Sequence, residues 1–189
     1  MSRFDAALAA IDAANARDPS GRELEYSKHM SEMLERLSPG APESVRLAAR
    51  AQHVERWRTP RESYPAGRQG YLQWRNHLYG VHAETAGRLV AQAGYDAATI
   101  ERVKSAVAKR HLKTNADAQL IEDVSALVFV EHYLADFARR HADYDEAKLA
   151  GILGKTWRKM SPRAREFALA GGAHLPPDLV PLIKKAAGA

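Results

Sequence analysis

The chain has 189 residues, 46% of them hydrophobic and 27% charged, so it is long enough to bury a core and its composition excludes disorder and low complexity. It has no cysteine, which excludes disulfides, thiolate metal ligands and a thiol nucleophile and fits a cytoplasmic protein. The formal net charge of +5 favours an anionic partner, such as a phosphate group or nucleic acid.

Apolar residues recur three and four positions apart along almost the whole chain, which predicts an all-α protein. The expected helices lie, in chain order, at about 4–11, 24–37, 42–57, 71–93, 96–110, 114–137, 143–153, 161–169 and 177–187. Residues 58–70 contain two prolines and two glycines, so we expect a loop there. We find no signal peptide pattern, no membrane span, no repeat and no long linker, and therefore predict one compact helical domain over residues 1–189.

Four histidines and one aspartate fall in, or at the end of, different expected helices: His29, His53, His82, His111 and Asp123. A helical bundle can bring such side chains together, and imidazole with carboxylate is the ligand set that suits Mn, Fe, Zn or Ni. Asp123 lies in the most apolar of these helices, where a carboxylate requires either a metal ion or a paired cation. The alternative to a metal is a buried ion pair of Asp123 with Arg50 or another arginine.

The order of these residues resembles the HD superfamily of metal-dependent phosphohydrolases. The likeness covers about residues 26–130 and implies an all-helical, HD-like core at about 22–141, followed by a helical extension at 142–189. In that family a His-Asp pair binds metal, whereas Val54 follows His53 here and the nearest acid is Glu55. On a regular helix Glu55 points away from the direction of His53.

The resemblance implies a divalent metal ion held by His29, His53 and Asp123, with His82 and His111 binding a second ion or the phosphate. A metal-bound water would be the nucleophile. We predict Glu55 and Glu122 as the catalytic acids, with Glu131 in reserve because it lies two turns beyond Asp123.

Longer segments of the chain resemble a family known as a domain of unknown function, DUF4202. The similar segments are 23–27, 49–53, 64–65 with 70–71, 127–133 and 156–161. This similarity spans most of the chain, and it implies membership of a family without implying an activity.

Arginine and aromatic residues alternate between positions 50 and 75, with few acids among them. Arginine forms bidentate bonds with phosphate and stacks on aromatic rings, so this segment fits an anionic substrate that carries a base. We predict that the substrate-binding residues are Arg50, Arg58, Arg61, Arg68, Trp57 and Tyr64, with Lys109 and Lys113 on the other side. The alternative is a solvated basic surface.

The leading hypothesis is a cytoplasmic, metal-dependent phosphohydrolase that acts on a nucleotide or another phosphorylated small molecule and has no membrane partner. The alternative is a non-catalytic helical module that binds RNA or an anionic partner, since Val54 replaces the family's aspartate. A third hypothesis is a protein that binds metal without hydrolysis.

Overall fold

The structure is a computed structural model that describes residues 1–187 and the side chains of residues 1–183. Within that part the chain forms helices and no strand, so the all-α prediction is confirmed. The chain divides into two compact units, Met1–Ile121 and Glu122–Ala189, and the boundary falls inside one helix, α6 (Ala116–Val128). No helix among the described residues is both long and apolar enough to cross a membrane.

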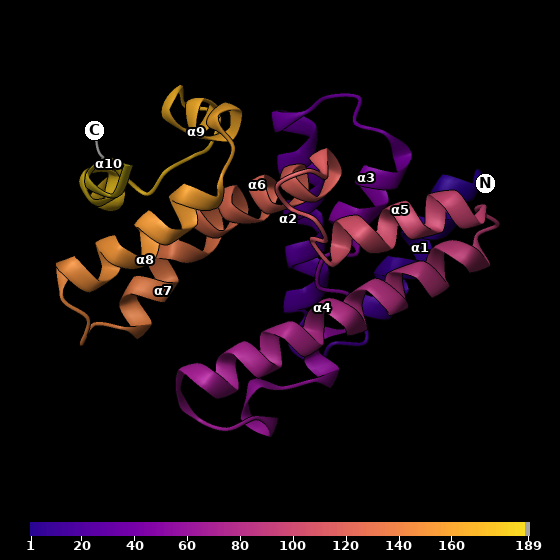
Figure 1. Cartoon of the computed structure of the whole chain (residues 1–189), viewed down its shortest axis with the longest axis horizontal. Helices are drawn as coiled ribbons and strands as arrows, with labels where there is room; N and C mark the ends of the chain where they lie inside the picture. Colours follow the sequence, from indigo (N-terminus) through magenta and orange to yellow (C-terminus); the bar gives the residue numbers. More distant parts are fainter. Residues whose placement is uncertain (188–189) are drawn as a thin grey trace. The chain divides into compact units, whose positions relative to one another are not determined.

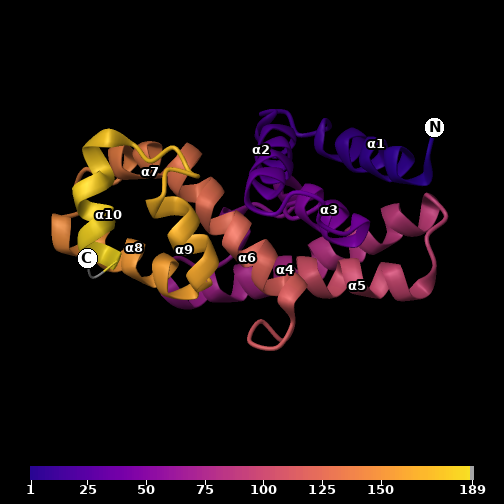
Figure 2. The same ribbon diagram turned by 90° about the horizontal axis from the view of Figure 1, so that it is seen from above.

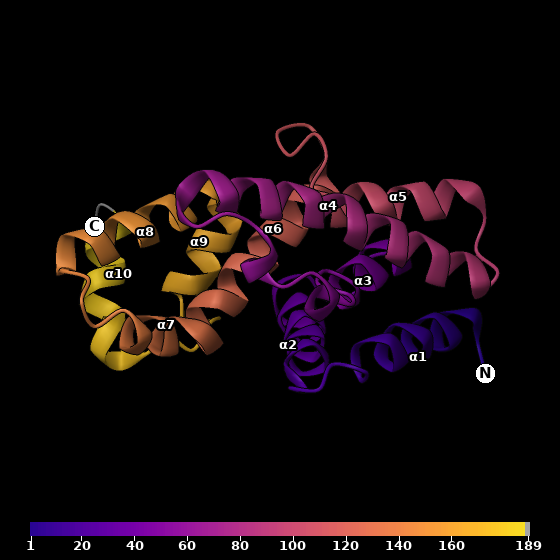
Figure 3. The same ribbon diagram turned by 90° about the horizontal axis from the view of Figure 1, so that it is seen from below.

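The first unit is built from five complete helices and two short 3-10 turns, drawn from indigo to magenta in Figure 1. They are α1 (Arg3–Asn15), α2 (Arg22–Leu37), α3 (Glu43–Arg50), η1 (Arg56–Arg58), η2 (Arg61–Ser63), α4 (Gly67–Gln92) and α5 (Ala97–Val107). Helices α4 and α5 lie side by side, and α3 packs against both α5 and α2 (Figure 3). Their shared core includes the fully buried Met30, Leu47 and Val90.

Helix α3 ends seven residues earlier than the sequence predicted. Its last residue is Arg50, and the chain then turns, with the Val54 amide donating to the Ala51 carbonyl at 3.0 Å. Glu55 follows with a φ of 55°, in the left-handed region that a helix interior does not allow. The predicted helix over 42–57 is therefore wrong from residue 51 onward, where turns replace the helix and lead to the left-handed Glu55.

Helix α4 begins at Gly67, inside the segment that was expected to be a loop. Gly70, in the first turn of this helix, packs against the backbone of Pro65: a Cβ atom at Gly70 would lie 1.8 Å from the Pro65 carbonyl oxygen. Glycine at position 70 is thus what lets the loop and the helix approach so closely. Trp74, one turn later, donates its indole N–H to the Thr59 carbonyl at 2.8 Å and fastens the loop to α4.

The second unit contains the rest of α6 and the segments that follow it. These are a short π-helical turn, η3 (Phe129–Tyr133), then α7 (Leu134–Arg140), α8 (Glu146–Lys159), α9 (Pro162–Leu169), η4 (Pro177–Leu179) and α10 (Val180–Ala187). Helices α8 and α10 pack together, as Figure 2 shows. Ser161 caps α9 by accepting a hydrogen bond from the Ala164 amide, which confirms the predicted helix start.

Candidate functional site

Two of the predicted histidines come together in the first unit. His53 lies in the turn after α3 and His82 lies in the middle of α4, and their ring centres are 5.7 Å apart with a tilt of 40°. The ring of Tyr26, on α2, stacks on His53 at 4.1 Å and 12°. Two helices, α2 and α4, and the turn after α3 therefore meet at one pair of imidazoles.

Each imidazole has one nitrogen engaged by the turn that follows α3. His82 is only 2% exposed, and its Nδ1 lies 2.9 Å from the carbonyl oxygen of Val54. Its other nitrogen, Nε2, is buried and has no hydrogen-bond partner among the described residues. The Nδ1 of His53 lies 3.2 Å from a terminal nitrogen of the Arg56 guanidinium.

Burial and nearby cations keep both imidazoles uncharged. Burial lowers the pKa of His82 from 6.5 to about 4, although its bond to Val54 opposes this. Burial also lowers the pKa of His53 well below its ordinary value, and the positive charges of Arg56, Lys109 and Arg75 lower it further. At neutral pH the pair is therefore two neutral bases surrounded by positive charge.

An acidic side chain, Glu23, belongs to the same region. It lies one turn before Tyr26 on α2, so the two side chains share a helix face. Burial raises the pKa of Glu23 to about 7; the Arg56 charge opposes the rise and Asp18 adds to it. A carboxyl group that holds its proton near neutral pH can donate that proton in a reaction. We call this group the histidine site; its members are Glu23, Tyr26, His53, Arg56, Arg75, His82 and Lys109.

Strained backbone occurs in two of the segments that build the histidine site. Glu55, Lys109 and His111 have φ values of 55°, 52° and 54°, and they are the described residues other than glycine with positive φ. Glu55 lies two residues after His53, and Lys109 is one of the cations that act on His53. Such conformations cost on the order of 1 to 3 kcal/mol each and cluster at functional sites.

A comparison with protein families gives one match that covers almost the whole chain. The model of the family described as domain of unknown function (DUF4202) matches residues 5–183. The chain belongs to this family. Neither the curated proteins nor the solved structures contain a match to this DUF4202 chain. All members of the histidine site lie inside the matched range.

The structure brings two of the predicted metal ligands, His53 and His82, together. No group of three or more His, Asp or Glu side chains in the described part of the DUF4202 chain could hold a metal ion. The Nδ1 of His53 faces a guanidinium, which has hydrogens but no lone pair to share. His29 is half-buried on α2, and His111 is exposed between α5 and α6. A metal bound by these residues stays a prediction.

In the second unit, Asp123 has a clear structural role. Its two carboxylate oxygens accept hydrogen bonds from the amide and the hydroxyl of Ser161, at 2.7 and 2.6 Å. The neighbouring Glu122 lies 3.7 Å from the ammonium group of Lys159. Glu131, the reserve acid, accepts from the His174 amide at 2.7 Å. These acids connect α6 and the π-turn to the segments around α9.

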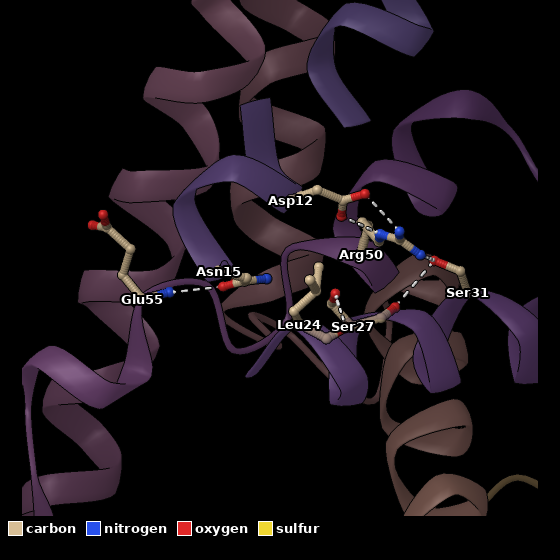
Figure 4. A network of polar contacts seen from close by, with 7 residues as sticks. All are labelled: Asp12, Asn15, Leu24, Ser27, Ser31, Arg50 and Glu55. Atoms are coloured by element: carbon tan, nitrogen blue, oxygen red, sulfur yellow. Dashed lines mark hydrogen bonds and ion pairs between the residues drawn. The ribbon is translucent and has the colours of Figure 1, made fainter. Parts of the chain in front are cut away.

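Arg50 and Glu55 belong to a polar network in the first unit, shown in Figure 4. Arg50 makes a bidentate contact with Asp12 at 2.6 and 2.7 Å and a weaker one with Ser31 at 3.3 Å. The Glu55 amide donates to the Asn15 side chain at 3.1 Å, and its carboxylate points away from Arg50 in the figure. Binding of substrate by Arg50 would require it to leave Asp12.

The other predicted substrate ligands are spread over the loop between α3 and α4 and over the segment after α5. Arg61 donates to the carbonyls of Tyr64, Pro65 and Gly67 and so holds the loop in shape. Arg58 donates to the Glu55 carboxylate at 3.1 Å. The indole nitrogen of Trp57 is buried without a hydrogen-bond partner among the described residues, while Arg68 and Lys113 are exposed.

Sequence reasoning did not select Glu23, Tyr26, Arg56 or Arg75 as site residues. The segment 23–27 did carry part of the resemblance to DUF4202, and that was the available signal for the first two. Arg56 and Arg75 were visible only as members of a basic run. The contact of Arg56 with His53 depends on the turn at 51–55, which the periodicity did not show.

Proposed function

We propose that this DUF4202 chain is a phosphohydrolase that acts on a nucleotide or another phosphorylated small molecule at the histidine site. One observation carries the proposal: a pair of uncharged imidazoles lies among the positive charges of Arg56, Arg75 and Lys109. Cations attract phosphate and stabilise the negative charge of its transition state. A neutral imidazole can accept the proton of an attacking water.

The histidine site contains groups for each part of that reaction. Arg56, Arg75 and Lys109 would bind the phosphate oxygens, and an imidazole would remove a proton from water. Glu23, which holds its proton near neutral pH, would protonate the leaving oxygen. Acid and base groups whose environments move their pKa values in opposite directions are typical of sites that catalyse proton transfer.

The resemblance to the HD superfamily extends the proposal to a divalent ion. Such an ion would act as a Lewis acid and make its bound water more acidic. The nitrogen that could bind this ion is Nε2 of His82, which carries a lone pair. His53 would first have to lose its contact with Arg56 before it could bind the ion. No step above depends on the ion. We place the activity in the cytoplasm because the chain lacks cysteine.

A second candidate function is binding of RNA or an anionic partner without chemistry. It is favoured by the exposed cations Arg58, Arg68 and Lys113.

A phosphate-release assay tests the proposal. The protein, either chelated or supplied with Mn, Fe, Zn or Ni, is incubated with p-nitrophenyl phosphate, nucleoside monophosphates and sugar phosphates. We expect release with at least one substrate, and Lys109→Met or Arg75→Met should raise KM by about 10-fold, as expected for a lost charged hydrogen bond. Arg88→Met is the matched control, since Arg88 is an exposed arginine on α4.

No release from any substrate, with or without metal, would reject the phosphohydrolase. If the protein then bound RNA with an affinity that falls steeply as salt rises, the second candidate would replace it.

A further inference from the structure

The partners of the two imidazoles determine where each ring carries its proton. The guanidinium of Arg56 can only donate hydrogen bonds, so the Nδ1 of His53 accepts and its proton resides on Nε2. A carbonyl oxygen can only accept, so the Nδ1 of His82 donates to Val54 and the lone pair resides on Nε2. The two rings are therefore opposite tautomers.

Their Nε2 atoms are complementary: His53 offers a hydrogen and His82 offers a lone pair. The lone pair of His82 is buried and has no donor among the described residues, and a buried acceptor without a partner is costly. The ring centres are 5.7 Å apart, so the two imidazoles are neighbours in the same site. One oxygen atom that both accepts and donates would satisfy both rings.

We propose that His53 and His82 together bind one hydroxyl-bearing oxygen, a water in the reaction, and that His82 is the base that deprotonates it. In this arrangement the oxygen accepts from Nε2–H of His53 and donates to Nε2 of His82. This inference rests on the proposed phosphohydrolase function. That proposal treats His53 and His82 alike, whereas here His53 donates to the water and His82 removes its proton.

The water oxygen forms a bond to phosphorus while its proton moves to Nε2 of His82. The bond between phosphorus and the ester oxygen breaks, and its electron pair stays with that oxygen, which takes the proton of the Glu23 carboxyl. The products are inorganic phosphate and an alcohol, and the protons pass from His82 to solvent and from solvent to Glu23.

In addition to its proposed contact with phosphate, Arg56 acts as a positioning residue, because one of its terminal nitrogens fixes the tautomer of His53. Its guanidinium lies over the Trp74 ring at 4.8 Å, and Trp74 is itself held by the Thr59 carbonyl. A cation held on an aromatic face has less freedom to leave, so the contact with His53 is stabilised. Without that donor, His53 would be free to place its proton on Nδ1 and present a lone pair to the water.

Nitrogen NMR measures the tautomers directly. The full chain is labelled with ¹⁵N-histidine, and long-range proton–nitrogen correlations assign the proton to Nδ1 or Nε2 in each ring. We expect Nε2–H for His53 and Nδ1–H for His82 at neutral pH. Arg56→Met should remove the preference at His53 and lower kcat more than it raises KM, and Arg56→Lys should restore part of both. Arg88→Met is the control.

The outcomes separate the two proposals. The opposite tautomer at either ring in the wild-type protein overturns this inference, even if phosphate is released. An unchanged His53 tautomer in a folded Arg56→Met protein overturns the role of Arg56. The expected tautomers in a protein without hydrolytic activity reject the phosphohydrolase, and with it the role of His82 as a base.

Discussion

The burial of His82 makes a quantitative prediction about the pH dependence of stability. Its pKa is about 4 in the folded protein and 6.5 when unperturbed, so the folded state resists protonation and the unfolded state does not. The contribution of His82 to stability is therefore complete above pH 6.5 and is lost progressively as the pH falls toward 4. Because His82 is 2% exposed, solvent screening does not reduce this effect.

The size of the loss follows from the shift. At about pH 5 the unfolded chain binds a proton at this position and the folded chain does not, which costs about 2 kcal/mol relative to pH 7.5. For a chain of this length that corresponds to a fall in Tm of about 6 °C. The variant His82→Asn lacks the titratable group, and its amide can still donate to the Val54 carbonyl.

The assay is urea unfolding followed by circular dichroism, at about pH 5 and about pH 7.5, with chelator present. We expect the wild-type protein to lose about 2 kcal/mol more than His82→Asn between these two conditions. The control is His77→Asn, which makes the same substitution at an exposed position of the same helix. Equal pH dependence of wild-type protein and His82→Asn would refute the neutral, buried state of His82.

Three further predictions concern residues around the site and in the second unit. Asp123→Asn should lower the free energy of unfolding by about 1 to 3 kcal/mol, because it weakens the hydrogen bonds to Ser161, and the loss should be equal with and without chelator. A loss seen only in metal-loaded protein would support Asp123 as the predicted metal ligand. Gly70→Ala should lower Tm because its Cβ would meet the Pro65 carbonyl, while Gly80→Ala, in open space on the same helix, should not. If the divalent ion of the proposed function is bound, elemental analysis of protein purified without a His tag should find a stoichiometric divalent metal that is lost in His82→Asn, and its absence from the wild-type protein would remove the ion from the proposal.

The sequence could predict the features of the fold that depend on local chemistry. Asp96 and Ser161 were expected at helix starts, and both side chains cap their helices in the structure, Asp96 by accepting from the Thr99 amide at 2.8 Å. The end of α3 could not be predicted in this way. The left-handed conformation of Glu55, whose amide donates to Asn15, has no signal in hydrophobic periodicity, because periodicity reports which side chains are buried and not the backbone angles.

The candidate site could be predicted only in part, for a related reason. The residue types of His53 and His82 marked them as candidates, but their pairing depends on how α3 and α4 pack. Arg61 is a second example. Its position in a basic run predicts a phosphate ligand, and in the structure its guanidinium donates to three loop carbonyls. The same residue types stabilise the fold and bind ligands, so only the contacts in the structure distinguish the two roles.

A titration of the ¹⁵N-histidine-labelled chain with inorganic phosphate tests most directly whether the histidine site binds phosphate. Phosphate bound among Arg56, Arg75 and Lys109 should shift the ring signals of His53 and His82 to saturation and leave those of His141 and His174, in the second unit, unchanged. Lys109→Met should weaken the binding, whereas Arg88→Met should not. Signals of His53 and His82 that stay unchanged, or that move only together with those of the second unit, would contradict the account.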